Sequence, residues 1–483
     1  MPSNPSVTFV ILTNGLGQLP TSPSQAICVL GTSSGGTNSV VVGPYTRATQ
    51  VVTDNGYGPG PELTAYLAAA GLTVYFCRTE TTTNGSNTAV THTGTGASTM
   101  TVTGNPFDTY NVIVTVVRAG TAGTDPEPGF TVSLDGGLTI SGEIRMPAST
   151  SYTGLAATTG LTLAFTAATL VVGDTYTFQS TAPTSNSSAV QTALAALRDD
   201  QHVVGMAYVV GGMPASTASA TLTTAESFLP KKKPIRVIVE ARDISVSTGE
   251  TEAQWMTSIE NDYATFASDD GLVGVAATPS LVPSAVSGIQ FRRGGGGMWA
   301  GILRAGQVRF GRSIGAVEDG ALAGITTVFH DEALNPGLTA DRFIALTSYP
   351  GLIGYYIALP NMMTNPGSDF SELQFGRVMD EVTRTNYQFF VKKLNTDVRV
   401  ESSGARKGKI LKKDALSLQA GANSAQNAAV VATGNASAVS VLVSQDDNIL
   451  STKTLTVLTE VLPLGYIETI TITQTFVNPA IGQ

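Results

Sequence analysis

The chain has 483 residues, enough for about three domains with hydrophobic cores of their own. Charged residues make up 13% of it, against ~25% in an average soluble protein, and Thr, Ser, Ala and Gly take their place. The net charge of −9 argues against a general nucleic-acid-binding protein, because neutralising phosphates requires clustered Lys and Arg. A surface of neutral polar groups is typical of β-structure covered by other subunits and of secreted β-proteins.

The cysteine content and the hydropathy pattern indicate where the protein is made. Cys28 and Cys77 lie in apolar, strand-like stretches, and two thiols in so long a chain argue against a disulfide framework. The apolar run from Phe9 to Leu12 is too short for a signal peptide, and no stretch reaches the ~18 to 20 apolar residues of a membrane span. We therefore expect a protein that is made in a cytoplasm and does not insert into a membrane.

The chain begins with a strand pattern. Val7, Phe9 and Ile11 alternate with their neighbours, and a Gly-containing turn signal then ends the run. We interpret residues 1–24 as an extended N-terminal arm.

Residues 25–79 are expected to form a small α/β part. A strand at 25–31 is followed by a helix at 61–71, which ends at Gly71, and by a second strand at 72–79.

The composition then changes, and residues 80–182 are rich in Thr, Gly and Ser. We interpret this stretch as an all-β outer insertion, a sandwich or small barrel, displayed on a loop of the α/β part. Its strand candidates lie at 112–117, 130–134, 161–165 and 175–179. Residues 80–182 form either a domain without a binding role or a module that binds a host surface or a glycan.

Helix and strand patterns alternate in residues 183–340, which we interpret as an α/β middle domain. The expected elements are a helix at 189–200 capped by Ser187 or Ser188, strands at 203–212, 235–241 and 272–278, and a helix at 251–270. Trp255, Ile259, Tyr263 and Phe266 share one face of the last helix. The order strand, helix, strand predicts a βαβ unit with parallel strands.

Residues 341–450 are expected to form a helix-rich C-terminal domain. One helical stretch runs from 340 to a Pro-Gly at 350–351, and a longer one, 371–395, carries an apolar stripe. The stripe consists of Leu373, Val378, Val382, Phe389 and Leu394.

A basic segment follows the longer helix. Eight basic residues and two acidic ones give residues 392–413 a net charge of +6, so the remainder of the chain carries −15. The basic residues are Lys392, Lys393, Arg399, Arg406, Lys407, Lys409, Lys412 and Lys413. They form either a solvated face or a contact surface for an acidic partner.

The C-terminal residues 451–483 read as a β-hairpin and an arm. Leu455 to Val461 is β-rich, a Pro-Leu-Gly turn follows, and Ile470, Ile472 and Phe476 then alternate with threonines. Strands at the ends of a chain can pair within their own domain or complete the sheet of a neighbour. The candidates for strand exchange between subunits are Val7, Phe9, Ile11, Leu455, Val457, Ile470, Ile472 and Phe476.

The sequence predicts no catalytic, cofactor or metal site. His92 and His202 stand apart, and His330 with Asp331 and Glu332 reads as a solvated loop rather than an acid-base or metal site. The run RRGGGG at 292–297 lacks the Lys-Ser/Thr of a P-loop, so we interpret it as a flexible connection. An α/β enzyme would need convergent acid, base and nucleophile residues, which do not stand out.

Several stretches resemble the contractile-tail sheath proteins of bacteriophages and related injection machines. They are VTFVILTNGLG at 7–17, SLDGG at 133–137, residues 160–183 and residues 455–476. The resemblance implies an α+β, multidomain fold, with an α/β C-terminal sheath core, an inserted all-β domain and extended terminal β-arms.

The same resemblance implies a structural subunit. In that family the arms add strands to the C-terminal sheets of adjacent subunits, so that hexameric rings stack into a helical polymer around a tail tube and contract. The partners would be copies of the chain itself, the tube protein, and baseplate and tail terminator proteins. The tube-facing surface would be the basic segment, and the protein would be part of a virion assembled in the bacterial host cytoplasm. A secreted or surface β-rich adhesin or surface-layer protein is the alternative.

Overall fold

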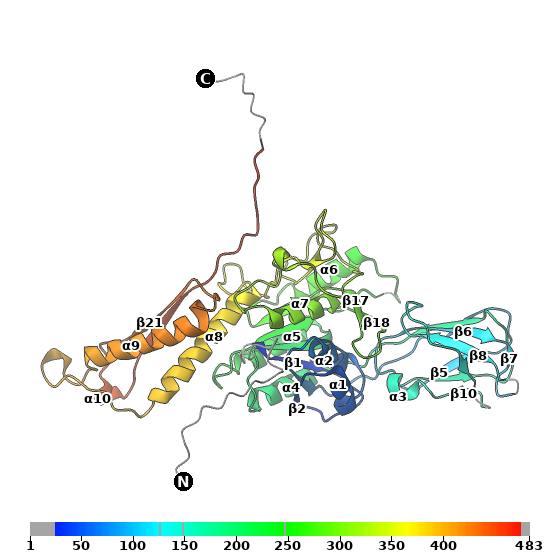
Figure 1. Cartoon of the computed structure of the whole chain (residues 1–483), viewed down its shortest axis with the longest axis horizontal. Helices are drawn as coiled ribbons and strands as arrows, with labels where there is room; N and C mark the ends of the chain where they lie inside the picture. Colours follow the sequence, from blue (N-terminus) through cyan, green and yellow to red (C-terminus); the bar gives the residue numbers. More distant parts are fainter. Residues whose placement is uncertain (1–24, 125–126, 147–148, 246–247, 475–483) are drawn as a thin grey trace, which may run out of the picture. The chain divides into compact units, whose positions relative to one another are not determined.

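The computed structural model describes residues 25–124, 127–146, 149–245 and 248–474. The described chain divides into two compact units (Figure 1). The first unit is formed by residues up to Phe310 and by Ile314–Asp380, and the second by Gly311–Ser313 and the residues from Glu381 onward.

A six-stranded sheet forms the centre of the first unit, with the strand order β16-β15-β14-β1-β3-β2. Its parallel strands are β1 (Ile27–Gly31), β3 (Val74–Arg78), β14 (Met206–Gly212), β15 (Arg236–Glu240) and β16 (Val273–Ala276). Strand β2 (Val41–Tyr45) is antiparallel to β3 at one edge. The predicted parallel βαβ unit is confirmed in β15, α6 and β16. The segments 25–79 and 183–340 thus contribute strands to one sheet.

Helices pack on both faces of this sheet because its strands alternate apolar side chains between two cores. Ile27 and Val29 of β1 belong to one core, and Cys28 and Leu30 belong to the other. The first core contains α1 (Ala48–Asn55), α2 (Pro59–Ala69) and α7 (Gly296–Gln307). The second contains α4 (Ser187–Asp199), α5 (Ala215–Glu226) and α6 (Glu252–Tyr263).

Helix boundaries follow local capping chemistry. After α2, the Leu72 N–H donates to the Leu67 carbonyl, and Gly71 has the positive φ of 83° that the predicted stop requires. Helix α4 is capped by Asn186, whose side chain accepts from the Ala189 N–H, and not by Ser187 or Ser188.

The insertion between β3 and α4 is all-β apart from the single turn α3 (Ala156–Thr159). Five antiparallel strands form its larger sheet: β4 (Thr91–Thr93), β13 (Thr175–Gln179), β6 (Asn111–Arg118), β8 (Gly129–Ser133) and β9 (Ile144–Arg145). A second sheet contains β10 (Ser151–Tyr152), β11 (Thr162–Phe165) and β5 (Met100–Thr103), and β12 (Thr169–Leu170) pairs with β7 (Gly120–Thr121). All four predicted strands are present, and their side chains share one core, as in a sandwich.

Two predictions for the rest of the first unit are wrong. The glycine run does not form a flexible connection, because Gly295 caps α7 and the next two glycines are buried in its first turn. Gly296 lies so close to the Ser280 side chain that an added Cβ would be 2.5 Å from its Oγ.

Residues 340–351 form no helix. Their apolar residues are instead buried beside the sheet, where Ile344 bridges to β16 and the short strand β19 (Leu346–Thr347) pairs with β20 (Tyr356–Ile357). The remaining elements are β17 (Ser280–Pro283), β18 (Gln290–Arg293) and the 3-10 turn η3 (Val317–Asp319).

The second unit consists of helices and a two-stranded sheet. Helix α8 (Leu373–Phe390) begins in the first unit and ends in the second. Of its predicted stripe Leu373, Val378 and Val382 are buried, whereas Leu394 lies beyond the helix and is 69% exposed. The other elements are η4 (Val391–Lys393), η5 (Gly404–Arg406), α9 (Lys412–Gln426), the π-turn η6 (Asn427–Val431), β21 (Ala438–Val443), α10 (Ile449–Thr452) and β22 (Val457–Leu462).

Candidate interaction surface

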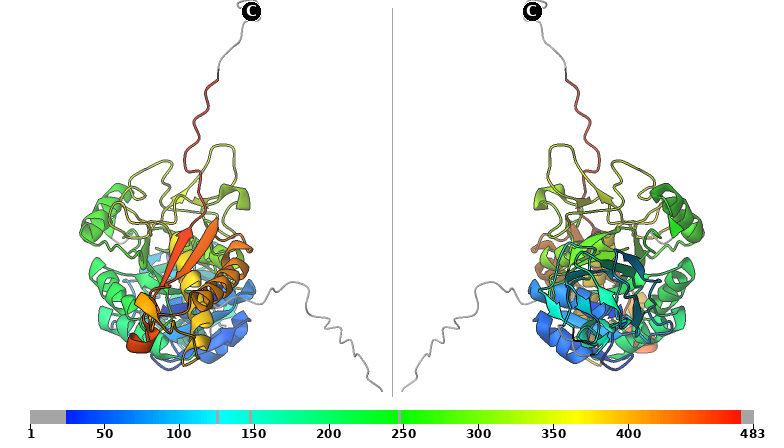
Figure 2. Two further views of the ribbon diagram at one scale, coloured as in Figure 1. Left: turned by 90° about the vertical axis from the view of Figure 1, so that its left-hand side faces the viewer. Right: turned by 90° about the vertical axis from the view of Figure 1, so that its right-hand side faces the viewer.

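The sheet of the second unit is a single antiparallel pair, β21 and β22 (Figure 2). Val441 and Val443 of β21 are buried on its inner face, against α9 and neighbouring residues. The outer face exposes three leucines, Leu442, Leu458 and Leu462, and Leu442 lies directly opposite Leu458. A two-stranded sheet has two edges, and the polar groups of the backbone on each edge require partners.

Side chains of helix α9 cover the outer edge of β21. The Asn423 side chain donates from Nδ2 to the Val441 carbonyl (3.0 Å) and accepts from the Val441 N–H at Oδ1 (2.8 Å). The Gln419 Oε1 accepts from the Val443 N–H at 3.2 Å. These amides occupy backbone groups that an added strand would need, so this edge is closed.

The outer edge of β22 is open. Along an antiparallel strand, successive residues direct their backbone N–H and C=O groups alternately toward the partner strand and away from it. The residues of β22 opposite Val439, Val441 and Val443 direct these groups away from β21. These residues are Val461, Thr459 and Val457. Among the described residues, no hydrogen bond reaches these backbone groups. The sheet can therefore accept a further strand on one side only.

The expected C-terminal hairpin is wrong. Strand β22 pairs with β21, and the described residues after it, 463–474, contain no strand. Leu455 packs against a small core that includes Ile410 and Val443, and Val457 begins β22. These two candidates for strand exchange are therefore occupied within the second unit itself.

The described end of the chain carries exposed isoleucines. The Tyr466 hydroxyl donates to the Gly311 carbonyl at 2.5 Å, within the second unit. Beyond this contact Ile467, Ile470 and Ile472 are 82%, 73% and 74% exposed. Val7, Phe9, Ile11 and Phe476, the other candidates for strand exchange, lie outside the described residues.

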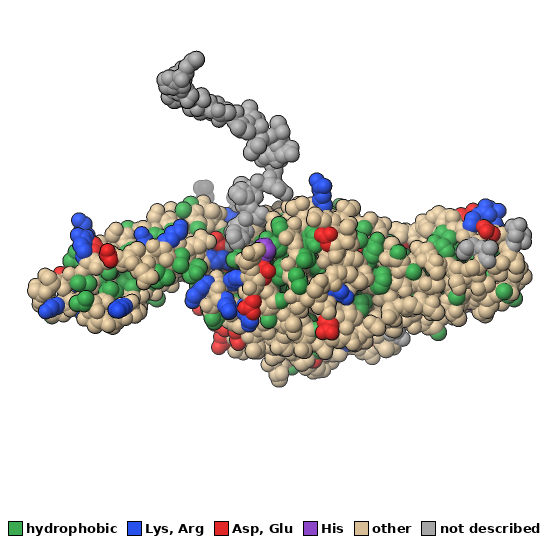
Figure 3. All heavy atoms as spheres, turned by 90° about the horizontal axis from the view of Figure 1, so that it is seen from below, with side chains coloured by type: hydrophobic (Ala, Val, Ile, Leu, Met, Phe, Trp, Pro, Cys, Tyr) green, Lys and Arg blue, Asp and Glu red, His purple; other side chains and the backbone are tan. Residues whose placement is uncertain are grey.

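The basic segment lies in the second unit, and three of its eight cations are paired there. Arg399 binds Asp414, while Arg406 and Lys409 both contact Asp446, at 2.7 Å and 3.2 Å. Hydrogen bonds from Arg399 and the positive charge of this residue lower the pKa of Asp414. Hydrogen bonds from Lys409 and Arg406, together with their charges, lower the pKa of Asp446. The other five basic residues of this segment are exposed lysines that form no salt bridge within the described residues: Lys392, Lys393, Lys407, Lys412 and Lys413. Figure 3 shows several Lys and Arg side chains on one face of this unit.

Two of these lysines occupy an unfavourable position. Lys412 and Lys413 are the first residues of α9, where the helix dipole is positive, and Leu411 before them provides no side-chain cap. A cation at this end of a helix costs about 0.3–1 kcal/mol. A gain elsewhere, such as a bound acidic partner, would offset this cost.

The histidines of the described chain lie in three separate environments. Its His, Cys, Asp and Glu side chains nowhere gather in a set of three or more that could hold a metal ion. His92 stacks on Tyr176 with ring centroids 4.4 Å apart, and His202 contacts Asp200. His330 is not in a solvated loop as expected but is buried. Within the described ranges, no helix combines the length and the apolar character needed to cross a membrane.

Comparison with known proteins places the chain in a family. A sequence profile described as DUF2586, N-terminal domain, matches residues 4–358. No curated protein matches the chain.

Several solved structures are similar to it in fold. A sheath tail protein from Desulfitobacterium hafniense is 12% identical, with a TM-score of 0.45 over 94% of this chain and 100% of that chain. A sheath tail protein from Listeria innocua is 10% identical, with a TM-score of 0.46 over 91% and 95%. A chain of the anti-feeding prophage baseplate in its contracted state is 11% identical, with a TM-score of 0.45 over 97% of each chain.

Proposed function

This chain belongs to the DUF2586 family, and we propose that it is the structural subunit of a contractile tail sheath. One observation carries this proposal: the second unit has a sheet with a single open edge, along β22, and the described residues after it expose Ile467, Ile470 and Ile472. The resemblance of residues 7–17 and 455–476 to sheath proteins supports the same role.

The open edge is suited to a strand from a second copy of the chain. A guest of about five residues would form four or five backbone hydrogen bonds, at about 1 kcal/mol net for each. In an extended segment Ile470 and Ile472 lie on one face, and Thr469 and Thr471 lie on the other. Burial of the isoleucine face would add hydrophobic stabilisation. The N-terminal residues Val7, Phe9 and Ile11 are proposed as the second donor.

Such links would let subunits stay connected while they rotate. The sheath would assemble around a tail tube in an extended, metastable state and relax to a wider lattice on release. This process requires no nucleotide and no catalytic residue. The five unpaired lysines of the basic segment are proposed to face an acidic tube, through exposed contacts weak enough to break on contraction.

The first test replaces the isoleucines of the terminal segment. We expect Ile470→Asp with Ile472→Asp to abolish polymers in negative-stain electron microscopy, because two carboxylates cannot be buried against a neighbouring subunit. The matched control is Thr469→Asp with Thr471→Asp on the opposite face, which should retain polymers.

Purified wild-type protein should form hollow tubes. Discrete particles that are unaffected by either pair of substitutions would contradict the sheath proposal and favour the adhesin alternative.

A further inference from the structure

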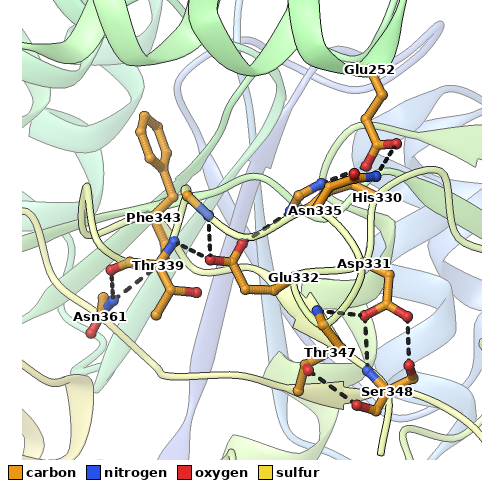
Figure 4. A network of polar contacts seen from close by, with 12 residues as sticks. Glu252, His330, Asp331, Glu332, Asn335, Thr339, Phe343, Thr347, Ser348 and Asn361 are labelled. Carbon is orange, nitrogen blue, oxygen red and sulfur yellow. Dashed lines mark hydrogen bonds and ion pairs between the residues drawn. The ribbon is translucent and has the colours of Figure 1, made fainter.

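A buried histidine lies between two carboxylates in the first unit. The His330 side chain has no exposed surface, and its Nδ1 is 2.8 Å from the Glu252 Oε1. Its Nε2 is 3.2 Å from the Glu332 Oε2 (Figure 4). Glu252 is the first residue of α6, whereas Glu332 follows two residues after the histidine. The contact therefore joins a helix to an irregular segment.

Both ring nitrogens face carboxylate oxygens, which favours a proton on each of them. A neutral imidazole carries one N–H, so only the imidazolium can donate to both Glu252 and Glu332. The ring also packs against Trp255, with centroids 5.6 Å apart, and water does not reach it. Loss of the proton would place a nitrogen lone pair against a carboxylate oxygen without a compensating donor.

The two carboxylates also hold the segment that follows. The Asn335 Nδ2 donates to the Glu252 Oε2 at 2.8 Å. The N–H groups of Gly337 and Thr339 donate to the Glu332 Oε1 at 2.9 Å and 3.1 Å. A change at the histidine therefore acts on the conformation of residues 330–339.

The chain continues from this segment to Ile344, which covers an edge of the six-stranded sheet. The Ile344 N–H donates to the Val275 carbonyl, and the Ala277 N–H donates to the Ile344 carbonyl, both at 2.9 Å. The Glu332 N–H donates to the Leu346 carbonyl at 2.8 Å. Strand β16 is the outermost strand of the sheet on this side, so the segment occupies backbone groups that would otherwise form an open edge.

We propose that His330, Glu252 and Glu332 form a protonation-dependent latch that keeps residues 330–348 on the edge of β16. When the imidazolium loses its proton, the latch opens and the edge strand becomes accessible. This inference does not depend on the proposed sheath function.

The direction of the pH dependence follows from the surroundings. Burial lowers the pKa of His330, but the hydrogen bonds and charges of Glu332 and Glu252 outweigh it and raise the pKa above the ordinary 6.5. The latch is therefore complete below pH 6.5 and is lost as the pH rises through the raised pKa of the folded state.

Other charged groups surround the latch. Helix α6 also contributes Glu260, whose pKa is raised by burial and by Asp341 and Glu332. The segment itself contributes Asp331, which is bound by the N–H and hydroxyl of Ser348. From β18, Arg292 stacks on Phe329, the residue before the histidine, at 3.7 Å from the ring centroid.

Hydrogen–deuterium exchange of the full-length protein, read by mass spectrometry between pH 5 and pH 9, tests the proposal. The pH profile of amide exchange in peptides that contain Ala277 and Ile344 reports the release of the edge strand and its midpoint. We expect a midpoint above 6.5. As the pH rises from 6.5 through the raised pKa, amide protection corrected for intrinsic rates should fall by about tenfold in total for each unit by which the pKa is raised.

Two variants that each remove one carboxylate charge from the latch complete the test. Glu252→Gln and Glu332→Gln should each lower this midpoint and the influence of His330 on amide protection. Glu226→Gln, the same change on an exposed residue of α5, is the control and should alter neither. A midpoint at or below 6.5, or amide protection that stays constant through the titration of His330, would overturn the latch.

Discussion

The Asp108 carboxylate and the Arg293 guanidinium form a buried ion pair that links the all-β insertion to the α/β part of the first unit. Their exposed fractions are 1% and 5%, and two hydrogen bonds of 2.5 Å and 2.7 Å join them. Arg293 also lies over the rings of Phe291 and Trp299, at 4.5 Å and 5.2 Å from their centroids. A buried charge without its partner is costly, so each residue requires the other.

We expect Asp108→Asn to lower the free energy of unfolding by about 3–5 kcal/mol, because it removes the only carboxylate among the described residues that forms an ion pair with the buried Arg293. Urea denaturation measures the change. The control is Glu143→Gln, which removes the carboxylate from the half-exposed pair with Arg118 and should cost no more than about 1 kcal/mol. Equal losses in the two variants would contradict the role of the buried pair.

At the scale of elements, β22 has one edge in a ladder and one edge free. Proline removes a backbone N–H, and a strand tolerates it only where that N–H faces outward. The N–H of Val461 faces the free edge, whereas the N–H of Glu460 faces Ser440 of β21. A proline at Val461 therefore tests assembly with other subunits, whereas a proline at Glu460 tests the folding of the subunit itself.

We expect Val461→Pro to prevent polymerisation while it lowers the stability of the isolated subunit by only about 1 kcal/mol. Glu460→Pro should destabilise the second unit itself, because it breaks the pairing with β21, at a cost of about 3 kcal/mol. Electron microscopy and thermal unfolding of both variants measure these effects. Normal polymers from Val461→Pro would rule out β22 as the accepting edge.

At the scale of the whole molecule, the charge distribution predicts how the subunit meets a tube. Reversal of the exposed pair Lys412 and Lys413 to Glu should weaken co-sedimentation with an acidic tube and leave tube-free polymers intact. The same substitutions should raise the stability of α9 by about 0.3–1 kcal/mol for each residue, because anions are favourable at a helix N-terminus. A loss of tube binding could then not be attributed to unfolding.

The matched control reverses another adjacent pair of exposed lysines, Lys231 and Lys232 of the first unit, and should leave tube binding unchanged. Unaltered co-sedimentation of the Lys412 and Lys413 variant would remove the support for a tube-facing basic segment.

Patterns within short stretches of the chain were sufficient to locate most elements. Alternation predicted the insertion strands such as β6 and β13, and the apolar spacing of Trp255, Ile259 and Tyr263 predicted the buried face of α6. These signals are local, since they depend on neighbours two to four residues away.

Pairing and burial required the folded chain. Strand β22 pairs with β21 rather than with the segment after it, and the amides that close the other edge of β21 come from α9, 18 or more residues earlier. His330 and Arg293 find partners 78 and 185 residues away, so their sequence neighbours did not indicate burial. Such contacts arise when distant elements pack, and only then does a polar side chain lose water and acquire a role.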